Sequence, residues 1–68
     1  MIITIPIVTE DQYGNDYVQD ALVNVGNMAY CIEVDGHCWI YFTEDFGIQS
    51  TLTMKEFKRH LVSKTMLN

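Results

Sequence analysis

The chain has 68 residues, of which 49% are apolar and 12% aromatic, and its formal net charge is −5. This length predicts one domain spanning residues 1–68, and the apolar content excludes an intrinsically disordered chain. Residues 1–54 contain no Lys or Arg, and all four basic side chains lie in residues 55–68. The negative charge of residues 1–54 opposes non-specific nucleic-acid binding and favours a protein partner with a basic surface. Alternatively, the acidic residues serve only to keep the chain in solution.

The N-terminal run Ile2–Val8 is β-branched and predicts a strand, in which Pro6 suits a sheet edge. It has no basic leader and is too short for a signal peptide or a membrane span, so we expect a cytoplasmic protein. Thr9–Asp16 has the composition of a loop. Tyr17–Val25 is expected to begin irregularly and to end as a short strand over residues 21–25.

The strongest local signal is the hairpin Ala29–Phe42, in which Asp35-Gly36 separates two β-rich runs, after a turn at Gly26-Asn27. An Asp-Gly pair favours a type I′ turn, and its two-residue loop fixes the register of both strands. The inner face then carries Ala29, Cys31, Glu33, Cys38, Ile40 and Phe42. The opposite face, called the aromatic face here, carries Tyr30, Ile32, Val34, His37, Trp39 and Tyr41. Neither is polar, so both should be partly covered.

After the hairpin, Gly47 is expected to supply a positive φ before a short strand at Ile48–Leu52. The sequence Thr53-Met54-Lys55-Glu56 fits a capping box, in which each end residue accepts a hydrogen bond from the other's backbone amide. It predicts a helix over residues 54–65. The apolar stripe of this helix would contain Met54, Phe57, Leu61, Val62 and Thr65, with Lys64 among the basic residues outside it.

These elements predict an α+β fold: an antiparallel sheet of four to five strands around the 29–42 hairpin, with one C-terminal helix over residues 54–65. The helix should lie on the inner face, where small and aliphatic side chains let it approach. The aromatic face would then be core under residues 1–25, an interface with a protein partner or a second copy of the chain, or a small-molecule pocket.

Tyr and Trp bury large areas at low entropic cost, so an aromatic surface is typical of protein interfaces. The acidic pair after the hairpin would match a basic partner, or would be a solvated turn. The residues predicted to bind a partner are Tyr30, Ile32, Trp39, Tyr41, Glu44 and Asp45.

Metal binding and catalysis find little support in the residue spacing. Cys31, Cys38, His37 and His60 are zinc-ligand types, but they lack paired ligand spacing, so we expect no metal and no cofactor. The same residues show no arrangement in which a nucleophile is activated by a base that a third residue orients. We therefore expect a non-enzymatic chain. The cysteines lie diagonally at about 7–8 Å between α-carbons, too far for a relaxed disulfide, and are expected to be buried thiols.

The order of segments from residue 22 to residue 61 carries a family resemblance. It consists of Leu22-Val23-Asn24-Val25, Asn27-Met28, the Asp35-Gly36 hairpin, Ile40-Tyr41-Phe42 and Thr53-Met54-Lys55-Glu56-Phe57. This order resembles the tail of LytTR-type DNA-binding domains and is similar to small FlbD-like proteins. The resemblance implies a sheet followed by one terminal helix. The basic cluster that LytTR domains carry before the Val-Asn strand is missing, because residues 17–21 contain no basic side chain.

The leading functional hypothesis is a small acidic interaction module, resembling the phage-encoded inhibitors that bind proteins of host defence systems. One alternative is a nucleic-acid-associated regulator acting through Lys55, Lys58 and Arg59, although a basic helix face is more often merely solvated. Another is a sponge for a small ligand at a subunit interface. No membrane partner is expected.

Overall fold

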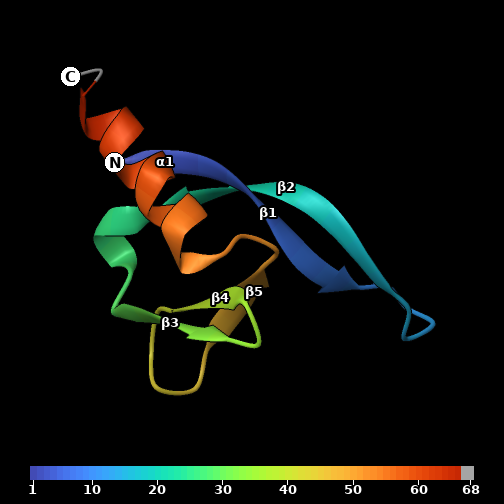
Figure 1. Ribbon diagram of the computed structural model, residues 1–68. Helices are drawn as coiled ribbons and strands as arrows, with labels where there is room; N and C mark the ends of the chain where they lie inside the picture. Colours follow the sequence, from blue (N-terminus) through green and yellow to red (C-terminus); the bar gives the residue numbers. More distant parts are fainter. Residues whose placement is uncertain (67–68) are drawn as a thin grey trace.

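A computed structural model describes residues 1–66 of the chain, with side chains described through residue 62. It contains one five-stranded antiparallel sheet, in the order β2-β1-β5-β4-β3, and one C-terminal helix (Figure 1), which confirms the predicted α+β fold. Within residues 1–66, no helix has the length and apolar character needed to cross a bilayer. The elements are β1 (Ile2–Glu10), β2 (Asp16–Asn24), a 3₁₀ turn (Val25–Asn27), β3 (Tyr30–Val34), β4 (His37–Tyr41), β5 (Gly47–Ser50) and α1 (Met54–Met66).

Strands β1 and β2 form a long hairpin that the sequence did not predict. The two strands pair continuously, from Ile2 opposite Asn24 to Glu10 opposite Asp16. The expected loop at residues 9–16 and irregular start at residue 17 are therefore wrong. Cross-strand packing against the β-branched β1 outweighs the weak strand preference of the Gln- and Asp-containing β2.

The turn of this hairpin is confined to residues 11–15. The carboxylate of Asp11 accepts hydrogen bonds from the backbone amides of Tyr13, at 2.8 Å, and Asn15, at 2.9 Å. Gly14 supplies the positive φ of 83° that reverses the chain. A side chain that bonds its own following backbone is the usual reason for Asp in a turn, so the turn composition was identified correctly but assigned too many residues.

Pro6 lies in an interior strand rather than at the predicted edge. Strand β1 pairs with β2 along its length and with β5 through Ile7 and Val8. The carbonyl of Pro6 accepts from the hydroxyl of Ser50 at 2.8 Å and from the amide of Thr51 at 3.4 Å. In an antiparallel sheet the backbone N–H and C=O of one residue point to the same neighbouring strand. The carbonyl of Pro6 points to β5, so the N–H that proline lacks would also have pointed to β5, where the β1–β5 pairing ends. The β1–β2 ladder is left intact.

The β3–β4 hairpin has the predicted register, from Tyr30 opposite Tyr41 to Val34 opposite His37. Its turn residues, Asp35 and Gly36, have φ values of 51° and 80°, as a type I′ turn requires.

Gly47 was predicted to have a positive φ, and this is wrong. Positive φ among the described glycines occurs only at positions 14 and 36. Gly47 instead begins β5 opposite Tyr41, and a Cβ there would lie 2.7 Å from the Tyr41 ring and 3.1 Å from the carbonyl oxygen of Ile40. Glycine is needed at this position because the tyrosine ring lies directly over the backbone.

The core lies between α1 and the inner face of the sheet, as predicted. Partly buried Met54 and Leu61 of α1 pack against it, but Val62 is 56% exposed and does not belong to the apolar stripe. The side chains of Lys64 and Thr65 lie outside the described residues. The buried apolar side chains are Ile3, Ile5, Val23, Cys38, Ile40, Leu52 and Phe57.

The predicted capping box begins α1. The amide of Thr53 donates to the Glu56 carboxylate at 3.0 Å, and the amide of Glu56 donates to the Thr53 hydroxyl at 3.2 Å. The carboxylate of Glu33 also accepts from the Met54 amide at 2.8 Å, a link between the hairpin and the helix that local sequence does not reveal. Hydrogen bonds from the Thr53 backbone and then from its side chain hold the pKa of Glu56 below its ordinary value.

The capping box makes stability depend on the protonation of Glu56. Because its folded-state pKa is lowered, Glu56 stabilises the fold above its unfolded-state pKa and loses this effect as pH falls through the folded-state value. Urea unfolding from about pH 6 to about pH 3 should therefore show a larger loss of stability for the wild type than for Glu56→Gln. Glu44→Gln, which removes an exposed loop carboxylate, is the control and should retain the wild-type slope.

The contact at Gly47 predicts a coupled effect. Gly47→Ala should lower the free energy of unfolding by about 1–3 kcal/mol, because the added methyl group meets the Tyr41 ring. In a Tyr41→Ala background the same change should lower the free energy of unfolding less, since the ring is gone and only the 3.1 Å approach to the Ile40 carbonyl oxygen remains. Chemical denaturation of the four variants measures this, and an equal loss in both backgrounds would contradict the packing assigned to Gly47.

Candidate functional site

The aromatic face is organised by two cross-strand pairs. Tyr30 and Tyr41 lie opposite one another, and their rings stack with centroids 4.9 Å apart and planes 15° apart. Ile32 lies opposite Trp39 in the same ladder. Such pairs stabilise a sheet and fix side-chain rotamers. The face is therefore a pre-ordered apolar platform.

Much of this platform is accessible to solvent. Tyr30 is 46% exposed and Ile32 is 44% exposed, whereas Trp39 and Tyr41 are half-buried. Helix α1 packs on the inner face. Of the three alternatives for the aromatic face, burial under residues 1–25 is not the one observed, because β1 and β2 extend the sheet beyond β5. Among the described elements, none lies over the aromatic face.

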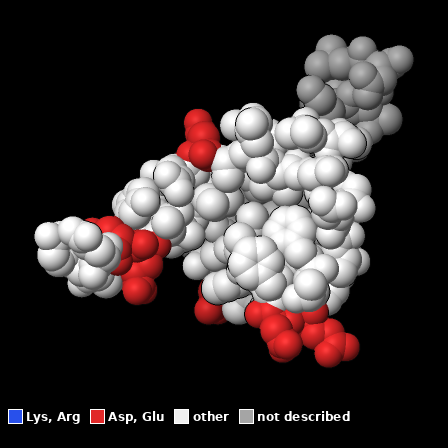
Figure 2. Space-filling view, turned by 180° about the vertical axis from the view of Figure 1, so that it is seen from behind, with Lys and Arg blue, Asp and Glu red and all other residues white. Residues whose placement is uncertain are grey.

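Acidic side chains flank the two ends of the β3–β4 hairpin. Glu44 and Asp45 are exposed in the loop that follows β4, and Asp35 is exposed in the turn at the other end. The Thr43 hydroxyl orders the loop by accepting from the amides of Asp45, at 3.3 Å, and Phe46, at 3.0 Å. The side of the molecule seen in Figure 2 displays Asp and Glu near its margins and, among its described residues, no Lys or Arg.

The basic residues gather on α1. Lys55, Lys58 and Arg59 are exposed and, with Val62, line a shallow groove of about 320 Å³. Arg59 also contributes to the lowered pKa of Glu56, after the hydrogen bonds from Thr53. The basic residues, which are clustered at the end of the sequence, are therefore also clustered on one surface of the folded chain.

The histidines and cysteines do not meet. His37 is exposed on the aromatic face, and Nδ1 of His60 lies 3.0 Å from the Glu56 carbonyl oxygen. Within the described part of the chain, no three His, Cys, Asp or Glu residues form a group that could hold a metal. The sulfur atoms of Cys31 and Cys38 instead both contact Met54.

Neither thiol is activated as a nucleophile. Burial raises the pKa of Cys31, against an opposing effect of Lys58. Burial also raises the pKa of Cys38, and the negative charges of Cys31 and Glu33 raise it further. Because the thiolate is the reactive form, these environments do not favour nucleophilic catalysis.

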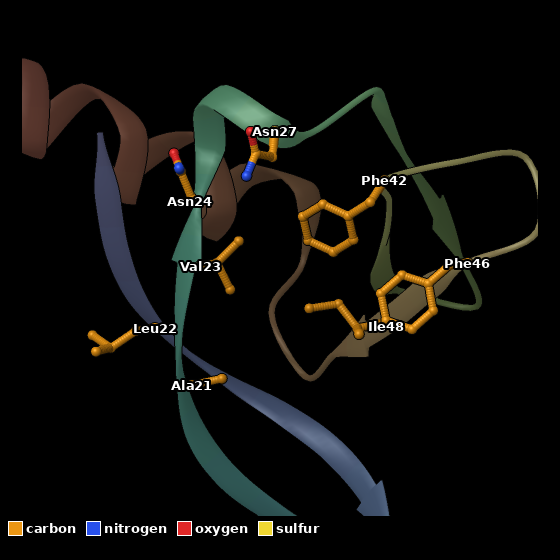
Figure 3. A pocket seen from close by; sticks show the side chains of 8 residues that line it. All are labelled: Ala21, Leu22, Val23, Asn24, Asn27, Phe42, Phe46 and Ile48. Atoms are coloured by element: carbon orange, nitrogen blue, oxygen red, sulfur yellow. The ribbon is translucent and has the colours of Figure 1, made fainter.

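A groove between β2 and the loop after β4 was not predicted. It has a volume of about 310 Å³, with Val23 on one side and Phe42, Phe46 and Ile48 on the other (Figure 3). Phe42 and Phe46 lie with ring centroids 5.8 Å apart, and Leu22 points away from them. The groove is apolar along its length, with Asn24 and Asn27 at one end.

Strand β2 also presents apolar side chains that the sequence interpretation missed. Val18 is 57% exposed and Leu22 is 78% exposed, on a strand that forms one edge of the sheet. The sequence carries no clear period of two here, because polar and apolar residues occur on both faces of the strand.

Comparisons with protein-family models, curated proteins and solved structures found no match to this chain. The resemblance to LytTR-type domains therefore stays a prediction.

Proposed function

We propose that this chain is a non-enzymatic interaction module whose aromatic face binds a protein partner with a basic surface. The observation that supports this is the stacked, uncovered pair of Tyr30 and Tyr41 beside exposed Ile32. Aromatic and aliphatic anchors of this kind dominate the energetics of protein interfaces. An apolar face left open to water is also the usual mark of a contact site.

The order already present in this face favours tight binding. Association has an entropic penalty for every side chain that must be fixed in the complex. The ring stack of Tyr30 and Tyr41 is formed in the free chain, and Trp39 is half-buried beside it. A partner would therefore gain apolar contact area without ordering these anchors.

The surrounding charges favour a basic partner over a second copy. Asp35, Glu44 and Asp45 lie at the ends of the hairpin that carries the face. Two copies meeting through this face would bring acidic residues together, whereas a basic surface would find complementary charge. An inhibitor of the type that phages direct against host defence proteins would act in this way, by occupying a basic surface of its target.

Affinity capture with immobilised wild-type chain, from nuclease-treated lysate of the cells that naturally produce it, tests this function. The captured protein is then purified and its affinity measured. Tyr30→Ala should weaken binding by at least about 30-fold, as loss of an interface anchor does. Val62→Ser is the matched control, since it removes an exposed apolar side chain from the opposite side and should bind like the wild type.

The grouping of Lys55, Lys58 and Arg59 around one groove favours nucleic acid as the second candidate. If nuclease is omitted and nucleic acid is recovered, its loss in Lys58→Ala/Arg59→Ala with retention in Tyr30→Ala would transfer the function to α1. Such binding would also weaken steeply with salt, by a slope of about −0.9 per neutralised phosphate. That result, together with the lack of a stoichiometric protein partner, would contradict the interaction-module proposal.

A further inference from the structure

Three sulfur atoms converge beneath the start of α1. The Sγ atom of Cys31 lies 3.9 Å from the Sδ atom of Met54, and the Sγ atom of Cys38 lies 3.8 Å from the same Sδ atom. The two cysteines share the inner face because Cys31 lies opposite Ile40, and Cys38 lies opposite Glu33. Both are free thiols.

The third sulfur is held in place by the helix cap. Met54 is the first residue of α1, directly after the capping box, and its amide donates to the Glu33 carboxylate at 2.8 Å. Glu33 is on the same hairpin as the cysteines. The capping contact thus anchors the methionine backbone to the strands that carry both thiols.

We propose that Cys31, Cys38 and Met54 form a binding site for a soft monovalent metal ion, Cu(I). Thiolate and thioether ligands favour soft metals, and Cu(I) is one of these. With metal–sulfur bonds of about 2.3 Å, three ligands around a trigonal ion lie about 4 Å apart. The separations of the two Sγ atoms from the Met54 Sδ atom match this spacing.

A zinc ion fits this set less well. Structural zinc sites use four ligands drawn from Cys, His and carboxylates. In the described part of the chain no third residue of those types joins Cys31 and Cys38. The Glu33 carboxylate, which is near Cys38, is already bonded to the Met54 amide. Two thiols and one thioether therefore favour the soft monovalent ion.

Binding releases two protons and transfers no electron. The S–H bonds of Cys31 and Cys38 break, their protons pass to solvent, and two copper–thiolate bonds and one copper–thioether bond form. Cys38 is fully buried, whereas Cys31 and Met54 are half-buried, so the ion would approach from their side.

This site is on the inner face of the sheet, so the inference does not depend on the function proposed for the aromatic face.

Anaerobic titration of the full chain with Cu(I), in competition with a chromogenic Cu(I) chelator, tests the site. One ion per chain should bind, with a thiolate-to-copper charge-transfer band in the ultraviolet. Met54→Leu keeps the side-chain volume but lacks the thioether, and should weaken binding by at least about tenfold, as the loss of a supporting ligand shell does. Met28→Leu, which removes a partly buried thioether elsewhere, is the matched control and should bind like the wild type.

Two results would overturn the proposal. Equal affinities of the wild type and Met54→Leu would show that the thioether is not a ligand. If the wild type bound Cu(I) no more tightly than the double variant Cys31→Ser/Cys38→Ser, the three sulfur atoms would serve only to pack the core. Circular dichroism checks that each variant is folded, and the single substitution Cys31→Ser, at the half-buried thiol, replaces the double variant if that unfolds.

Discussion

The register of the β3–β4 hairpin is the constraint on which the rest of the structure depends. The left-handed pair Asp35-Gly36 closes a two-residue turn, and that turn decides which side chains face α1. A slip by one residue would exchange the two faces, sending Tyr30 toward the helix and Cys31 toward solvent. Both the aromatic platform and the sulfur cluster therefore follow from one tight turn.

One helix and one sheet allow only one face of the sheet to be covered. Helix α1 takes the inner face, and β1 and β2 widen the sheet instead of folding over the aromatic face. A core of this size gives little stability in reserve. The contacts at the start of α1 consequently matter more than they would in a larger domain. The Thr53–Glu56 bonds cap the helix, and the Glu33 carboxylate attaches it to the sheet.

Local signals predicted the features that depend on neighbouring residues in the chain. The Asp35-Gly36 turn and the Thr53–Glu56 capping box each need only a few adjacent side chains, and both are confirmed. Features that depend on a distant partner were missed. The role of Gly47 depends on the ring of Tyr41, and the third sulfur depends on how α1 docks. Strand β2 was missed because its polar composition is compensated only by pairing with β1.

The burial of the β1–β2 hairpin differs between its two ends. Near its open end, Ile3, Ile5 and Val23 are buried in the core, whereas all of β2 from Asp16 to Asp20 is exposed and the tip projects away from α1 (Figure 1). The molecule is correspondingly elongated, with extents of 41 × 23 × 21 Å. Backbone amides at the tip are protected only by their own ladder, so their hydrogen exchange should proceed by local fraying, while amides beside Ile5 should exchange only when the whole domain opens. A single hairpin would thus contain amides that exchange by local fraying and amides that exchange only by global opening.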